Sequence, residues 1–206
     1  MRTGIYIDGF NLYYGCLKNG PYKWLDLNKL FSIVLGRNFT IEKVKYFTAR
    51  IKATPADRSA PQRQDVYIRA LKEFIPDIEI HFGHFMSHKV RMANANPPPN
   101  TLEVIKTEEK GSDVNLAVHV LNDSWQNKYD CAVIVSNDSD MAEAMKLIKT
   151  HHPHIKLGLV TPSDNRTSQQ LKIHADFVRL IRESALRNSQ LPDLIPGTTI
   201  HKPTSW

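Results

Sequence analysis

Four aspartates lie at positions suited to holding a divalent cation. One ends an apolar run, one opens a helical pattern, and two follow a second apolar run: Asp8, Asp113, Asp138 and Asp140. Carboxylate oxygens are the ligands that Mg²⁺ and Mn²⁺ prefer, with waters and substrate phosphates completing the shell. A cation held in this way lowers the pKa of a bound water and stabilises the oxygens of an in-line phosphoryl displacement.

Each aspartate also has a purely structural interpretation. Asp8 could be a turn residue before Gly9, Asp113 could interact with a helix dipole, and Asp138 could be an N-cap. Two observations weaken these interpretations when they are taken together. Asp113 lies on the apolar stripe of its helix, where an unpaired acid is costly, and the segment 136–140 offers five capping candidates for one helix. Capping alone therefore does not explain the acids.

The elements that must position these acids alternate between strands and helices. We expect strands at 4–8, 44–51, 78–90, 102–106, 132–135, 156–160 and 177–181, and helices at 25–35, 61–74, 111–122, 139–149 and 168–173. This alternation predicts an α/β fold of three layers, PIN-like or Rossmann-like, with a mostly parallel central sheet between helices. In such sheets the ligand site lies beyond the carboxyl ends of the strands, where the aspartates are.

Two segments depart from this pattern. The residues 78–106 predict a hairpin, whose loop carries Pro97, Pro98 and Pro99 and cannot be a helix or a central strand. The last part of the chain, 185–206, is rich in proline and polar residues, which predicts a tail or a wrapping arm. We therefore expect one domain over 1–184, with the hairpin as an elaboration, followed by a C-terminal tail.

Composition excludes several classes of protein. The chain has 206 residues, 41% of them hydrophobic, so it is long enough for one independent core. It lacks both the apolar run of a membrane span and the leader of a secreted protein, and Cys16 and Cys131 cannot form a disulfide framework. We therefore expect a cytoplasmic protein that does not enter the membrane. The net charge is +6, and the excess lies within residues 1–60, where a polyanion would be attracted.

Three blocks of sequence resemble the NYN-domain family, a branch of the PIN-like nucleases. They are Ile5-Tyr6-Ile7-Asp8-Gly9-Phe10-Asn11-Leu12, Lys110-Gly111-Ser112-Asp113-Val114-Asn115-Leu116 and Val133-Ile134-Val135-Ser136-Asn137-Asp138-Ser139-Asp140. Their order and spacing fit that family over roughly residues 3–182. The resemblance implies a parallel sheet flanked by helices and an acidic pocket that binds Mg²⁺ or Mn²⁺. It also implies ribonuclease activity.

The same resemblance assigns roles to individual residues. The metal ligands would be Asp8, Asp113 and Asp138, with Asp140 as a supporting catalytic acid. Among the substrate-binding candidates, Asn11 would order the first loop or contact phosphate, and Ser136 and Asn137 would position water or substrate. Lys110 would contact phosphate or be a solvated charge, and Arg50 is a further candidate from the basic excess. Asn137 stands where many relatives have glycine, so the loop at this position is expected to be narrower or stiffer.

Other chemistry finds less support. His81, His84 and His88 do not share one strand face, and His151, His152 and His154 fall in an expected surface loop. The sequence contains no HExxH, GxGxxG, GxxxxGK[ST] or GxSxG motif. The expected function is hydrolysis of RNA by a metal-dependent nuclease. The competing interpretation is a module that binds RNA or protein without cutting. The residues do not discriminate RNA from DNA, and they leave association between copies of the chain open.

Overall fold

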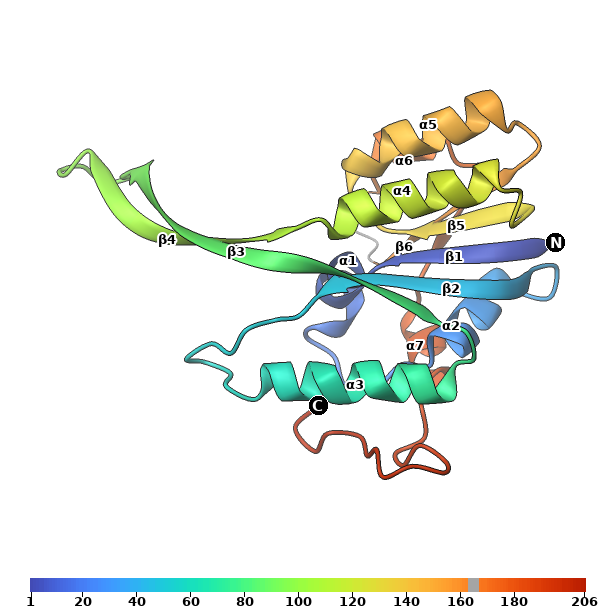
Figure 1. Cartoon of the computed structure of the whole chain (residues 1–206), viewed down its shortest axis with the longest axis horizontal. Coiled ribbons are helices and arrows are strands. Elements are labelled where there is room, and N and C mark those ends of the chain that lie inside the picture. Colours follow the sequence, from blue (N-terminus) through green and yellow to red (C-terminus); the bar gives the residue numbers. More distant parts are fainter. Residues whose placement is uncertain (163–166) are drawn as a thin grey trace.

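The computed structural model describes residues 1–162 and 167–206 and contains one seven-stranded sheet in the order β4-β3-β2-β1-β5-β6-β7 (Figure 1). Neighbouring strands are parallel except β3 and β4, which are antiparallel. The strands are β1 (Arg2–Asp8), β2 (Thr40–Ala49), β3 (Glu79–Ala93), β4 (Thr101–Lys110), β5 (Cys131–Val135), β6 (Lys156–Thr161) and β7 (Phe177–Leu180). The predicted α/β class with a mostly parallel sheet is confirmed.

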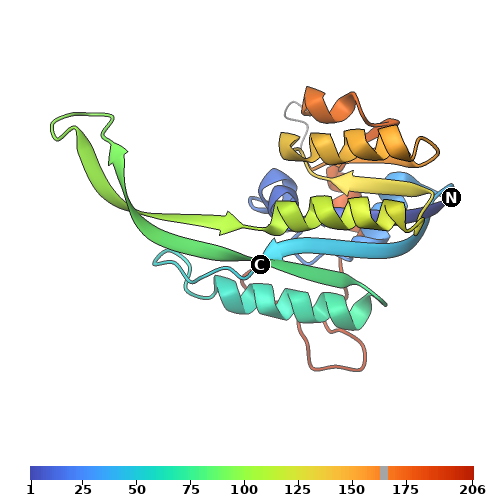
Figure 2. The same cartoon turned by 45° about the horizontal axis from the view of Figure 1, so that its top comes forward.

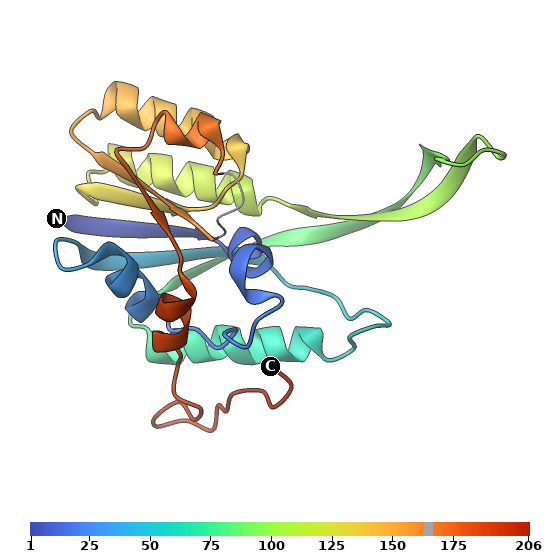
Figure 3. The ribbon, with the colours of Figure 1, turned by 180° about the vertical axis from the view of Figure 1, so that it is seen from behind.

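Helices cover both faces of this sheet. They are α1 (Gly9–Leu12), α2 (Leu27–Leu35), α3 (Ala60–Phe74), α4 (Ser112–Trp125), α5 (Ala142–His151), α6 (Gln169–Lys172) and α7 (Glu183–Asn188). Two single turns complete the set, η1 (Tyr13–Leu17) and η2 (Ser139–Met141). Side chains alternate along β1, so Ile5 and Ile7 pack toward α2, α3 and α7, whereas Tyr6 packs toward α4 and α5 (Figures 1 and 3). These two apolar layers form the core.

The central strand β1 is where the topology changes direction. β1 pairs with β2 on one side and with β5 on the other, and the chain returns from the first side to the second only after β4. In open parallel sheets, such a point leaves a crevice beyond the carboxyl ends of the two strands. Asp8 ends β1, and Ser136 directly follows β5. The fold therefore brings two of the predicted blocks together at this crevice.

The strands β3 and β4 form an arm that extends away from the body of the molecule (Figure 2). β3 runs beside β2 from Glu79 to Gly83, and from His84 onward it pairs with β4 alone. The hairpin was expected to end near residue 106, but β4 continues to Lys110. The last residues of β4 are therefore the root of the arm and reach the start of α4.

The C-terminal segment packs on the α2, α3 and α7 side. The boundary placed between residues 184 and 185 falls inside α7, and Leu191 and Ile195 beyond it are buried. The ring of Trp206 lies 6.0 Å from that of Trp24 and 5.6 Å from that of Tyr67. Figure 3 shows this segment running past α7 to the C-terminus beside α3. The residues after α7 therefore wrap the body.

Within the residues that the structure describes, none of the helices is both long and apolar enough to span a bilayer.

Candidate active site

An open cavity of about 580 Å³ lies beyond the carboxyl ends of β1 and β5. Its walls come from the first loop of the chain, from the root of the arm, from the start of α4 and from the loop after β5. The lining residues are Asp8, Phe10, Asn11, Tyr14, Gly15, Phe85, Glu109, Ser112, Asp113, Asn137 and Asp138. Asp8, Asp113 and Asp138 were predicted from distant parts of the sequence, and the fold places them around one cavity.

The carboxylate of Asp8 is fixed by hydrogen bonds at both oxygens. The backbone N–H of Asn11 donates to Oδ1 at 2.8 Å, which makes Asp8 the N-cap of α1. The hydroxyl of Ser136 donates to Oδ2 at 3.0 Å. The Asp8 side chain is almost fully buried, and this burial raises its pKa although the two hydrogen bonds oppose the shift. Its orientation toward the cavity is therefore set by the first turn of α1 and the loop after β5.

The loop after β5 is tied to the first loop by a short chain of hydrogen bonds. The N–H of Asn137 donates to Oδ1 of Asn11 at 3.0 Å, and the N–H of Asp138 donates to the Ser136 hydroxyl at 3.0 Å. Oδ1 of Asn137 accepts from the N–H of Ser168 at 2.7 Å. In this structure Asn11 and Ser136 therefore hold backbone and carboxylate groups in place. Asn137 links the cavity wall to the segment before α6.

Asp113 reaches the cavity because the chain turns sharply between β4 and α4. Gly111 is in the left-handed region at a φ of 96°, and Ser112 begins the helix. Glu109 fixes this turn, since its Oε1 accepts from the N–H of Ser112 at 3.1 Å and its Oε2 accepts from the Ser112 hydroxyl at 2.7 Å. Asp113 then falls in the first helical turn, half-buried and facing the other acids.

Replacing Gly111 with alanine is expected to destabilise the fold. An L-residue at this positive φ costs about 1–2 kcal/mol relative to glycine. Urea unfolding of Gly111→Ala should show this loss, whereas Gly20→Ala, with its nearest neighbouring atom 3.9 Å from an added Cβ, should be close to neutral. Equal stability of the two variants would contradict the role given to the turn.

The acids around the cavity act on one another. The pKa of Asp113 is raised to about 6, first by burial and then by the negative charges of Asp8, Asp138, Glu109 and Asp140. This excess of negative charge in a partly buried place is unfavourable when nothing compensates it. A cation among the carboxylates would relieve the repulsion.

Stability without a metal ion should therefore depend on pH in a defined direction. The folded pKa of Asp113 lies above its unfolded value of about 3.8, so its ionisation opposes folding fully above pH 6 and not at all below pH 4. In EDTA, Asp113→Asn should melt at a higher temperature than the wild type at pH 8, and the difference should vanish toward pH 4. Thermal unfolding of both proteins across this range measures it, and a variant less stable at pH 8 would refute the assignment.

Two features of the cavity were not predicted as part of the site. Glu109 lies in the same strand as Glu103 and Glu108, and the charge pattern of this strand does not distinguish Glu109 from them as a site residue. Phe85 comes from β3, and its ring lies 5.9 Å from that of Phe10, edge to face. Tyr14 completes an aromatic side of the cavity and is 63% exposed.

Other predicted residues do not line the cavity. Asp140 is exposed on η2 and contributes through its charge, while its N–H donates to Oδ1 of Asp138 at 3.0 Å. Lys110 pairs with Glu108 at 3.4 Å. Arg50 pairs with Asp65 at 3.0 Å and lies over the ring of Phe82. In this structure neither cation lines the cavity.

The donor set of the cavity suits a hydrated hard cation. Only Glu79, His81 and His119, among the described residues, bring three metal-ligand atoms within 4.8 Å of one another, so the three aspartates stand farther apart than that. Mg²⁺ keeps several of its waters and binds through one or two carboxylates, so a wider set of acids can hold it. Asp8, Asp113 and Asp138 therefore fit Mg²⁺ or Mn²⁺ in both chemistry and charge.

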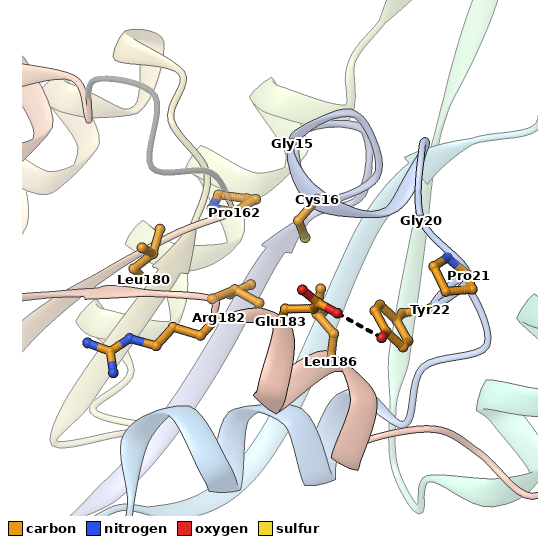
Figure 4. A pocket seen from close by; sticks show the side chains of 11 residues that line it. Gly15, Cys16, Gly20, Pro21, Tyr22, Pro162, Leu180, Arg182, Glu183 and Leu186 are labelled. Atoms are coloured by element: carbon orange, nitrogen blue, oxygen red, sulfur yellow. Dashed lines mark hydrogen bonds between the residues drawn. The ribbon is translucent and has the colours of Figure 1, made fainter.

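A second cavity of about 540 Å³ lies on the other side of Gly15 (Figure 4). Tyr22 and Glu183 meet in it through a hydrogen bond of 2.9 Å. Cys16 also lines this cavity, but burial raises the pKa of its thiol to about 12. The thiol is thus protonated at neutral pH, and Cys16 lacks the thiolate that nucleophilic chemistry requires.

Comparison with known proteins places the chain in a family. The sequence profile of the NYN domain matches residues 2–182. This chain is an NYN-domain protein. The match contains the cavity acids and the arm, so the site described here belongs to the NYN domain itself.

Two further proteins are similar to this NYN-domain protein. One is the 6-hydroxy-3-succinoylpyridine 3-monooxygenase HspA of Pseudomonas putida (strain DSM 28022 / S16). The two sequences are 35% identical over an alignment 240 residues long, which covers 100% of this chain and 75% of that protein. The other is a crystal structure of a protein of unknown function from Vibrio parahaemolyticus RIMD 2210633. It has a TM-score of 0.56 and 18% identity, and the match covers 92% of this chain and 96% of that one. This second likeness supports the fold.

Proposed function

We propose that this NYN domain is a PIN-like, metal-dependent nuclease that hydrolyses phosphodiester bonds in RNA. The observation that carries the proposal is the gathering of Asp8, Asp113 and Asp138 from three separate elements around one open cavity. Mg²⁺ or Mn²⁺ bound there would lower the pKa of a coordinated water and stabilise the charge that develops on the phosphate oxygens.

The protein residues give this chemistry its geometry. Asp8 is held at both oxygens, so the orientation of its carboxylate at the cavity wall is fixed by the protein. Asp113 shares the negative field of four other acids, and a cation would be drawn to that field. Glu109 fixes the turn before α4 and contributes charge at the cavity wall.

The aromatic side of the cavity favours an unpaired strand as substrate. Phe10, Tyr14 and Phe85 line the cavity with the acids. Tyr14 is exposed and Phe10 and Phe85 are half-buried, and an exposed ring beside a phosphate-binding site stacks on bases of single strands, at about 1–3 kcal/mol per base. The excess of positive charge in residues 1–60 would attract the phosphate backbone. A single-stranded nucleic acid therefore fits this surface better than a duplex does.

The test is cleavage of labelled single-stranded and hairpin RNA in Mg²⁺, Mn²⁺ or EDTA, with matching DNA oligonucleotides alongside. We expect cleavage of single-stranded RNA that requires the metal. Cleavage of DNA at an equal rate would mean that the protein is a nuclease without preference for RNA. RNA binding without cleavage in either metal would favour a non-catalytic RNA-binding module.

A second candidate function comes from the relative in Pseudomonas putida. That protein carries the name of a monooxygenase acting on 6-hydroxy-3-succinoylpyridine, and its similarity extends over the whole of this chain. A monooxygenase inserts one atom of O₂ and reduces the other to water, so it needs an electron donor. Incubation with 6-hydroxy-3-succinoylpyridine, O₂ and NADH, followed by chromatography, tests this function. Consumption of the pyridine without RNA cleavage would select it over the nuclease.

A further inference from the structure

Three potential metal ligands lie together outside the aspartate cavity. Glu79 and His81 are two residues apart on β3, so they face the same side of the sheet. His119 comes from α4, which packs over β2 and β3 on that side (Figures 1 and 2). The ligand atoms of the three side chains all lie within 4.8 Å of one another. None of the three lines either cavity.

One pair of ligand atoms already stands at the separation that a bound ion needs. Nε2 of His81 lies 3.3 Å from Oε2 of Glu79. Two ligand atoms bonded to one Zn²⁺ at ~2.1 Å stand roughly 3–3.5 Å apart. The His81 and His119 rings have centroids 3.9 Å apart, and the buried Phe47 ring stacks on His81 at 5.0 Å and contacts His119 at 5.6 Å. Phe47 therefore fixes the orientation of both imidazoles.

The chain already places a cation beside these ligands. Nζ of Lys45 lies 3.2 Å from Oε2 of Glu79 and 3.3 Å from Nδ1 of His119. Its shortest contact is with Oδ2 of Asp123, at 2.6 Å. Lys45 can thus keep its Asp123 partner while the two longer contacts are exchanged for an ion. The site is built to hold positive charge.

We propose that Glu79, His81 and His119 form a binding site for a divalent transition-metal ion such as Zn²⁺ or Fe²⁺. Two imidazoles and one carboxylate suit these ions, whereas Mg²⁺ prefers oxygen ligands alone. Three protein ligands leave coordination positions for water or substrate. The proposal is independent of the nuclease function, because the two sites share no residue.

Metal binding by the full chain tests the proposal directly. After dialysis against a chelator, and with Mg²⁺ in excess to occupy the aspartate cavity, the wild type should bind one Zn²⁺ by titration calorimetry. The X-ray absorption spectrum of the zinc-loaded protein should contain two imidazole ligands. His81→Gln and His119→Gln should each weaken binding by at least ~10-fold, with melting temperatures in EDTA close to that of the wild type.

Two control variants separate this site from other potential ligands. His152→Gln probes the histidines near Trp125, and Glu103→Gln removes an exposed carboxylate of β4 that lies outside both sites. Both should bind Zn²⁺ as the wild type does. Unchanged binding in His119→Gln, loss of binding in either control, or a wild type that does not bind Zn²⁺ would each overturn the proposal.

Discussion

Asp113→Asn is expected to abolish metal-dependent cleavage of RNA while preserving the fold. The side chain keeps its size and can still make hydrogen bonds, but it loses the charge that attracts a cation to the cavity. Asp113 is half-buried among acids, so its charge acts at short range and is poorly screened. Loss of a residue that supports a metal site costs 10–100-fold in activity, and loss of a direct ligand should cost about two orders of magnitude or more.

The measurement is the initial rate of cleavage of a labelled RNA in Mn²⁺, with circular dichroism to confirm the fold. Asp193→Asn is the matched control, because this substitution makes the same chemical change at an exposed residue that does not line the cavity. The control should cleave at the wild-type rate. Cleavage by Asp113→Asn at that rate would remove Asp113 from the site and would point to a contaminating nuclease.

Lys45→Met is expected to give the largest loss of stability. Lys45 and Asp123 have side chains only 6% and 2% exposed, and their charged atoms are 2.6 Å apart. Burial alone would raise the pKa of Asp123, but hydrogen bonds from Lys45 and from the Tyr6 hydroxyl outweigh it and lower that pKa. Removing the lysine leaves the buried carboxylate with only the exposed Lys128, at 3.2 Å, as a cation, at a cost of about 3 kcal/mol.

Denaturant unfolding measures this loss, and Lys43→Met provides the comparison. Lys43 is on the same strand and also pairs with Glu79, at 3.2 Å, but its side chain is 39% exposed. An exposed pair contributes about 1 kcal/mol or less. Adding Asp123→Asn to Lys45→Met should restore much of the lost stability, because the buried charge is then gone. A Lys45→Met variant as stable as Lys43→Met would contradict this account.

The sequence was informative where a pattern has one physical cause. The position of Asp113 on an apolar stripe predicted that its carboxylate would have a partner or a bound cation. The structure places this side chain at a cavity with Asp8 and Asp138. The central strands β1, β2 and β5 are rich in β-branched or aromatic residues, and most of the predicted strand bounds fall within a few residues of the observed ones. These features depend on local composition, which the sequence displays directly.

Other parts of the site depend on pairings between distant segments. Glu109 matters because β4 continues to the start of α4, and the length of a two-stranded arm is set by pairing with β3 rather than by its own residues. His119 looks like one polar residue on a helix, and its partners are about 40 residues earlier in the chain. The segment of α1 and η1 was missed, although Phe10, Tyr13, Tyr14 and Leu17 recur at helical spacing.

The position of β1 at the centre of the sheet has a consequence for the order of folding. β1 is synthesised well before β5, because its pairing of Thr3 with Cys131 joins residues 128 positions apart. At about 5–20 residues per second, a ribosome takes roughly 6–26 s to make that interval. During this time one edge of an apolar strand has no partner. We therefore expect folding to be slow and late, as contacts of long sequence separation require. The cavity acids should come together only in that last step.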